Sequence, residues 1–210
     1  MILFAVRNII KENKTGGVNI TDYEKLKTIT HNTEVIWKNV RGIVPNSVAD
    51  KMDNAMLNWI TELTETLSIW IHKGIHLTDG ELILAKTNLG ALTECWLKFF
   101  YCVYYEDYLK NPKLNTKGVI VEPNKMSFES LKLFSVGILW EKGDSNYLWV
   151  EKVQHQRNSI HAFNYRNIGT PKEFIDDVEK LYKFVDSLTM RLPPVEDFIE
   201  TYPIGYKTIF

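Results

Sequence analysis

The chain has 210 residues, of which 45% are hydrophobic and 24% charged, with 25 Lys and Arg against 26 Asp and Glu. This composition fits one globular domain with a sizeable core and excludes a disordered chain. The net charge of -1 excludes a broadly basic nucleic-acid coat, although it is compatible with a local basic site.

The N-terminal stretch 1–10, MILFAVRNII, is apolar but interrupted by Arg7. It has no basic leader and no small-residue cleavage site, so we interpret it as a first buried helix, with a strand as the alternative, and not as a signal peptide. No part of the sequence has the ~20 uninterrupted apolar residues of a membrane span. We therefore expect a soluble, cytoplasmic protein without a membrane partner.

Helix start and stop signals divide the next part of the chain. Thr21 and Glu24 form a capping-box pair that predicts a helix over 21–40. Apolar residues that recur at steps of three and four predict a second helix over 47–72, which Gly74 ends.

Another capping-box pair, Thr78 and Glu81, precedes a long stretch without proline that is dense in Leu, Trp, Phe and Tyr. It predicts one helix over 81–110 that is apolar on more than one face. Such a helix is typical of the centre of a bundle or of a subunit interface. We expect it, or the helix that carries Arg157, to contribute to a homodimer interface.

Two cysteines, Cys95 and Cys102, lie in this predicted helix. Seven helical residues separate two side chains by ~10 Å along the axis, which is beyond the reach of a disulfide. We expect two buried thiols in a reducing compartment.

The second half of the chain continues the helical pattern. Thr170, Pro171 and Glu173 combine a capping box with proline at the first helical position, which is the strongest helix start in the sequence. The expected order is a loop over 111–126, helices over 127–141, 145–164 and 170–191, and an irregular tail to Phe210.

These elements predict an all-α helical bundle, because strand-like alternation is nearly absent. We expect an N-terminal helical region over 1–76 that packs on a bundle over 77–192, followed by a C-terminal tail over 193–210.

The sequence has no phosphate-binding glycine loop, no zinc-protease motif and no paired CxxC motif. His72 and His76 are four residues apart, but a glycine lies between them and no nearby ligand completes a metal site. We expect neither a metal nor a cofactor.

The polar stretch VQHQRNSIHAFNYRNIGT stands out from the rest of the chain. Arg157 and His161 are four residues apart, so a continuous helix would place them on one face, and Asn158 and Gln154 extend that face. A guanidinium fork and an imidazole that titrates near neutral pH suit a phosphate. The alternative is structural: Arg and Asn hold a helix junction, and His161 is half-buried in it.

The run RNSIHAF, residues 157–163, resembles the signature of the HEPN superfamily, in which an Arg and a polar residue, often Asn, precede a His on one helix. The resemblance covers 79–192 and implies a HEPN-like helical bundle, usually dimeric. Active members are metal-independent ribonucleases of toxin–antitoxin, phage-defence and RNA-processing systems, and other members are binding modules without nuclease activity. Here three residues separate Arg157 from His161, which is fewer than in the usual signature.

The resemblance implies an endoribonuclease in which the RNA 2′-hydroxyl attacks the phosphorus. His161 would act as general acid or base, Arg157 would stabilise the phosphoryl oxygens, and Asn158 would orient the phosphate or the imidazole. The expected partners are RNA, a second copy of the chain, and an antitoxin or defence protein. The alternative is a non-catalytic helical interaction or ligand-binding module.

Four further residues complete the expected site. Gln154 and Arg166 are candidates for substrate binding, with a helix C-terminal cap as the alternative role of Arg166. Glu94 and Lys98, four residues apart, predict a local ion pair. The alternative for Glu94 is a carboxylate that steers Arg157 or His161.

Overall fold

The computed structural model describes residues 22–163 and 165–194. The helix expected over 1–10 and nearly all of the expected tail lie outside these residues. Within the described ranges the chain is helical and contains no β-strand, which confirms the all-α prediction. No described helix is both long enough and apolar enough to span a bilayer.

The α-helices are α2 (Asp22–Trp37), α3 (Asn46–Asp53), α4 (Leu57–Lys73), α5 (Asp79–Val103), α6 (Tyr105–Tyr108), α7 (Phe128–Phe134), α8 (Ser145–Arg157) and α9 (Pro171–Thr189). Short 3₁₀ helices are η1 (Gly74–His76), η2 (Pro123–Lys125) and η3 (Asn158–Ile160).

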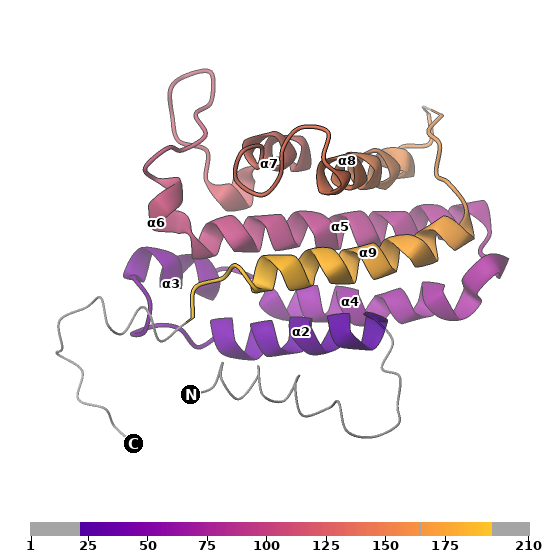
Figure 1. Ribbon diagram of the computed structural model, residues 1–210, viewed down its shortest axis with the longest axis horizontal. Helices are drawn as coiled ribbons and strands as arrows, with labels where there is room; N and C mark the ends of the chain where they lie inside the picture. Colours follow the sequence, from indigo (N-terminus) through magenta and orange to yellow (C-terminus); the bar gives the residue numbers. More distant parts are fainter. Residues whose placement is uncertain (1–21, 164, 195–210) are drawn as a thin grey trace.

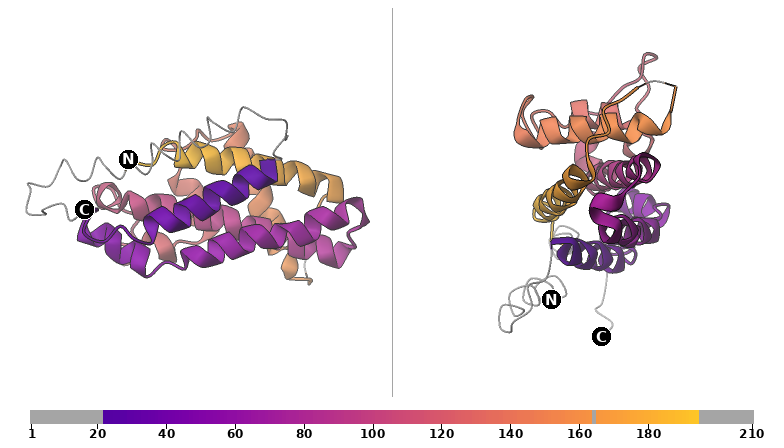
Figure 2. Two further views of the ribbon diagram at one scale, coloured as in Figure 1. Left: turned by 90° about the horizontal axis from the view of Figure 1, so that it is seen from below. Right: turned by 90° about the vertical axis from the view of Figure 1, so that its right-hand side faces the viewer.

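Four helices form the body of the bundle. α2 packs against α4 and α9, and α5 packs against the same two helices, so that each helix has two neighbours in a closed ring (Figure 1). α8 lies on the outer side of α5, with α7 beside it, and α2 is at the opposite side of the molecule (Figure 2). The segment with the polar stretch is therefore an added layer on the central helix.

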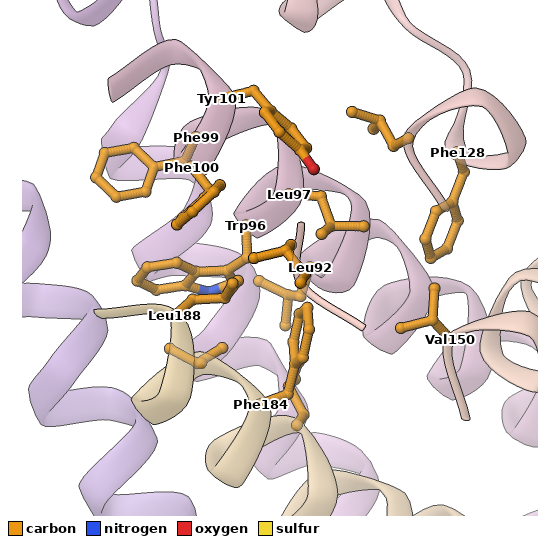
Figure 3. Close-up of a cluster of buried hydrophobic side chains, with 14 of the residues drawn as sticks. Leu92, Trp96, Leu97, Phe99, Phe100, Tyr101, Phe128, Val150, Phe184 and Leu188 are labelled. Atoms are coloured by element: carbon orange, nitrogen blue, oxygen red, sulfur yellow. The ribbon is translucent and has the colours of Figure 1, made fainter. Parts of the chain in front are cut away.

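The core lies where α5 meets α8 and α9. Trp96 of α5 is 1% exposed and stands among leucines, with Phe184 and Leu188 of α9 on one side and Val150 of α8 on the other (Figure 3). Trp96 also makes an edge-on contact with Phe99, with ring centroids 5.6 Å apart. Helices from both halves of the sequence, from Leu26 onward, thus share one core.

α5 is apolar on several faces because other helices of the same chain surround it. Its start is fixed by the predicted capping box, in which Thr78 accepts a hydrogen bond from the backbone of Glu81 and the Glu81 side chain accepts one from the backbone of Thr78. Sixteen of its 25 residues are buried within a single chain. Its composition is therefore explained by its central position and needs no subunit interface.

Two of the predicted helices are interrupted. The stretch 47–72 contains α3 and α4, because the chain leaves the helix at Asn54, whose side chain donates to the Asp50 carbonyl at 2.7 Å. Asparagine side chains compete in this way with the helical backbone. The stretch 81–110 contains α5 and the four-residue α6, separated at Tyr104, which has a ψ of 34°.

Two others are shorter than predicted. Ser127 caps α7 as expected, but the helix ends at Phe134, and a turn follows in which Gly137 has a φ of 78°. α8 ends at Arg157, seven residues before the predicted end at 164. The helix start at Thr170 and Pro171 is confirmed, with the complete capping box.

A buried charge network joins α5, α8 and α9. The Lys86 ammonium lies 2.8 Å from Asp177, and both side chains are 1% exposed. Trp149 and Lys152 of α8 donate to the other oxygen of Asp177 at 3.0 Å and 2.5 Å. Burial lowers the pKa of Lys86 against the opposing effect of Asp177.

Candidate functional site

The end of α8 differs from the continuous helix that the sequence predicts. Arg157 is the last residue of α8, Asn158–Ile160 form the 3₁₀ helix η3, and His161 follows with a ψ of 85°, outside any helix. The tighter 3₁₀ turn does not preserve the four-residue register of an α-helix. Arg157 and His161 are therefore close in the chain, but they do not share one α-helical face.

Arg157 is anchored by a carboxylate of the central helix. Its guanidinium lies 2.8 Å from Glu94, and its side chain is 35% exposed whereas that of Glu94 is 10% exposed. The other Glu94 oxygen lies 2.8 Å from Lys98. Glu94 thus makes the predicted local ion pair and also contacts Arg157, so one face of the guanidinium fork is held while the rest reaches solvent.

The stem of Arg157 packs tightly on α5. A Cβ atom on Gly90 would lie 2.6 Å from the Cβ of Arg157, a distance that real Cβ atoms do not show. The hydroxyl of Thr87 reaches the Arg157 carbonyl at 3.4 Å. Gly90 is therefore what allows the end of α8 to approach α5 so closely.

His161 is exposed, and Asn158 is half-buried. The His161 backbone N–H donates to the Asn158 carbonyl at 3.3 Å, which closes the turn between them. Two large apolar side chains stand beside them at the surface, since Ile160 is 49% exposed and Phe163 102% exposed. The imidazole is accordingly accessible to a ligand and is not part of the core.

The two expected substrate-binding residues lie apart from the Arg157 guanidinium. Burial raises the pKa of Glu129 on α7, but hydrogen bonds from Lys132 and Gln154 outweigh it, so the pKa of that carboxyl is lowered. Gln154 is thus engaged with α7. Arg166 lies in the connection to α9, outside any helix, and its guanidinium is 3.1 Å from the Nδ1 atom of His155.

A second polar feature, which the sequence reasoning missed, lies on the other flank of α8. A cleft there has eight lining residues: five from α8, two from the connection and one from α9, which are Leu148, Glu151, Lys152, His155, Gln156, Asn167, Gly169 and Glu173. The signal in the sequence was the absence of any Asp or Glu between Glu151 and Glu173. That stretch contains Arg157 and His161 and five of the eight residues that line the cleft.

The remaining candidates show no shared site. His72 lies in the last turn of α4, and His76 lies in η1 beyond Gly74, whose φ is 53°. In the described part of the chain no three His, Cys, Asp or Glu side chains come together in a way that could hold a metal ion. Cys102 is buried, which raises the pKa of its thiol to about 11, while Cys95 is half-buried beside Glu94.

Comparison with known proteins finds no matching family model, no matching curated protein and no matching solved structure.

Proposed function

We propose that this protein is a HEPN-like, metal-independent endoribonuclease of a bacterial defence or toxin–antitoxin system, with Arg157 and His161 at its reaction centre. One observation carries the proposal. The nearly buried carboxylate of Glu94 anchors Arg157, and the exposed imidazole of His161 follows one turn later in the chain. A fixed cation and, four residues later, an accessible imidazole suit cleavage by phosphoryl transfer.

In the proposed reaction the RNA 2′-hydroxyl attacks the adjacent phosphorus and gives its proton to a general base. The bond from phosphorus to the 5′-oxygen breaks, and a general acid gives that oxygen a proton. The products are a 2′,3′-cyclic phosphate and a 5′-hydroxyl end. Arg157 stabilises the charge on the non-bridging oxygens, and Asn158 orients the phosphate or the imidazole.

The two proton transfers occur on opposite sides of the phosphorus, and one imidazole does not reach both at once. A two-fold homodimer supplies a second His161, so the proposal includes a dimer in which the two α8 ends face each other. An antitoxin or defence protein would then control access to the RNA site.

The test is His161→Ala, with His31→Ala as the matched control, because His31 is exposed on α2 at the opposite side of the molecule. We expect wild type and His31→Ala to cleave RNA in the presence of EDTA and to leave a 2′,3′-cyclic phosphate. His161→Ala should lose cleavage while its melting temperature stays unchanged, since exposed substitutions usually alter stability by less than about 0.5 kcal/mol. Undiminished cleavage by His161→Ala would remove this residue from the mechanism.

A second candidate function is a non-catalytic helical interaction module. The tight contact of Arg157 with Gly90 and its ion pair with Glu94 favour this alternative, since both make the arginine a structural tie between α8 and α5. RNA or partner binding without cleavage, unaffected by His161→Ala, would support it.

A further inference from the structure

A short two-stranded ribbon between α6 and η2 projects from one end of the bundle, and nothing in the proposed reaction uses it (Figure 1). Leu114 and Ile120 form an antiparallel bridge at its centre. The residues on either side of this bridge are joined by backbone hydrogen bonds of 2.8 Å and 2.9 Å. In this pattern the bridged side chains lie directly opposite each other on one face, and their backbone polar groups point outward.

The turn at the tip of the ribbon is fixed by its own residues. The Asn115 side-chain oxygen accepts from the backbone of Lys117 at 2.9 Å and from that of Val119 at 3.0 Å. Gly118, with a φ of 74°, supplies the left-handed conformation that the turn requires.

Tyr108 of α6 holds the base of the ribbon. Its hydroxyl donates to the Val121 carbonyl and accepts from the Lys113 backbone at 3.1 Å, and the residue is only 4% exposed. With both its tip and its base fixed, the ribbon presents its surface side chains in one orientation.

This surface is apolar and has open edges. Leu114 is 50% exposed and Ile120 41% exposed, and Val119 beside them is 57% exposed. The backbone N–H and C=O groups of Leu114 and Ile120 have no hydrogen-bond partner among the described residues. A rigid apolar ribbon with unpaired edges is suited to an extended segment that adds as a further strand.

The ribbon is also positively charged. Lys113 and Lys117 are exposed, and neither has an ion pair within the described ranges. The stretch 111–121 contains no Asp or Glu. The complementary segment is therefore extended, apolar and acidic.

The C-terminal part of the same chain has this composition. Residues 195–202 read VEDFIETY, in which three of eight residues are acidic, and the first basic residue after Pro194 is Lys207. Phe198 and Ile199 lie together between the acidic residues, so this segment supplies both the apolar groups and the charge.

The described chain ends close enough to the ribbon for this contact. The Arg191 carbonyl accepts from the Tyr104 hydroxyl, and Tyr104 is one helical turn from Tyr108, whose N–H donates to the Tyr104 carbonyl at 2.8 Å. This turn and two tyrosine side chains span roughly 20 Å. Ten extended residues reach ~33 Å, so 195–202 can lie along the ribbon.

We infer that residues 195–202 bind to the ribbon as an added strand, with Phe198 and Ile199 on its apolar surface and the neighbouring carboxylates beside Lys113 and Lys117. Because the segment is tethered, its effective concentration is on the order of millimolar, and another acidic partner would have to displace it. The inference does not rest on the proposed ribonuclease activity.

The test measures how fast chymotrypsin cuts after Phe198 in the full chain. Each rate is divided by that of a free peptide of residues 192–204 with the same sequence. Ile120→Asp places a charge on the ribbon, and Ile75→Asp is the matched control, because Ile75 is 74% exposed in η1 at the other end of the bundle (Figure 1).

We expect the cut to be at least about fivefold faster in Ile120→Asp than in wild type, since cleavage tracks the undocked population. Ile75→Asp should match wild type, and all three melting temperatures should agree because the side chains are exposed. Equal normalised rates in wild type and Ile120→Asp would overturn the inference.

A second arm reverses the charges on both segments. Lys113→Glu combined with Lys117→Glu should expose Phe198, and so should Glu196→Lys combined with Glu200→Lys. All four changes together should restore slow cleavage, because opposite charges face each other again. These side chains lie on the ribbon surface or in the tail, so the arm remains informative where Ile120→Asp fails to fold. Fast cleavage in the fourfold variant would overturn the inference.

The same assay identifies other occupants of the ribbon. Protection of Phe198 that increases with protein concentration would assign the bound segment to a second copy, and it would overturn the contact within one chain. A wild-type rate equal to that of the free peptide would also overturn it, and would leave the ribbon to a separate acidic partner. Cleavage of RNA is not read in this assay, so its outcome is independent of the proposed reaction.

Discussion

Arg157 has two roles that one substitution can separate. Its guanidinium is ion-paired with Glu94 and yet 35% of the side chain is exposed, so it could hold α8 on α5, bind a phosphate, or do both. Lysine keeps the charge and the reach to Glu94, but it lacks the planar fork that binds two oxygens at once.

We expect Arg157→Lys to lower the cleavage rate by roughly 10²–10³-fold, as for the loss of one transition-state donor, with little change in melting temperature. The control is Arg41→Lys on the surface, where Arg41 is ion-paired with Asp50 and Asp53. A large fall in melting temperature with cleavage retained would identify Arg157 as a structural tie only.

At the scale of the element, the closest contact between α5 and α8 is at Gly90. In Gly90→Ala the new methyl group would meet the Arg157 stem, and the nearest atom, the Cβ of Arg157, is attached to the backbone, so the helices must move apart. Overpacking of this kind costs about 1–3 kcal/mol, against a helix-propensity gain of up to about 1 kcal/mol.

We therefore expect Gly90→Ala to be destabilised by about 1 kcal/mol in urea unfolding and to lose cleavage as Arg157 shifts. Gly80→Ala is the matched control in the same helix, because nothing lies within 4 Å of its new methyl group. That variant should be as stable as wild type or more so. Equal stability of the two variants would contradict the tight packing at Gly90.

At the scale of the whole molecule, the buried pair of Lys86 and Asp177 ties α5 to α9 and, through Lys152, to α8. Removing one partner of a buried pair leaves the other charge uncompensated and costs about 3–5 kcal/mol. We expect Lys86→Met to lie near the lower end of this range in urea unfolding, because Lys152 still contacts Asp177.

The control for this prediction is Lys183→Met, which removes a surface ion pair with Glu179. Exposed pairs contribute about 0–1 kcal/mol. Similar losses of unfolding free energy in the two variants would show that the buried network contributes no more to stability than a surface ion pair.

The proposed homodimer is the second prediction at this scale. Because most of α5 is buried within its own chain, we place the interface on the surface beside His161, which presents Ile160 and Phe163. We expect a dimeric mass by light scattering at micromolar concentration and a monomeric mass for Phe163→Ser, whose melting temperature should be unchanged because the ring is fully exposed. A monomeric wild type would contradict the dimer and, with it, the two-histidine mechanism.

The sequence by itself determined the helical class and the best-marked helix starts. Thr78 and Thr170 are followed three residues later by glutamates, so both capping boxes form from contacts within one turn. Local signals of this kind need no knowledge of the rest of the chain. The polar stretch around Arg157 was equally visible, since it lacks acidic residues over many positions.

Only the tertiary structure decided where α8 ends, what surrounds α5, and which residues Arg157 meets. The helix stops at Arg157 and η3 packs on α5, although the local sequence predicts further helical turns. Gly90 and Glu94 lie more than sixty residues before Arg157, and Lys86 lies 91 residues before Asp177. Contacts over such distances form because burial of apolar surface brings whole helices together, and no pattern within one helix carries that information.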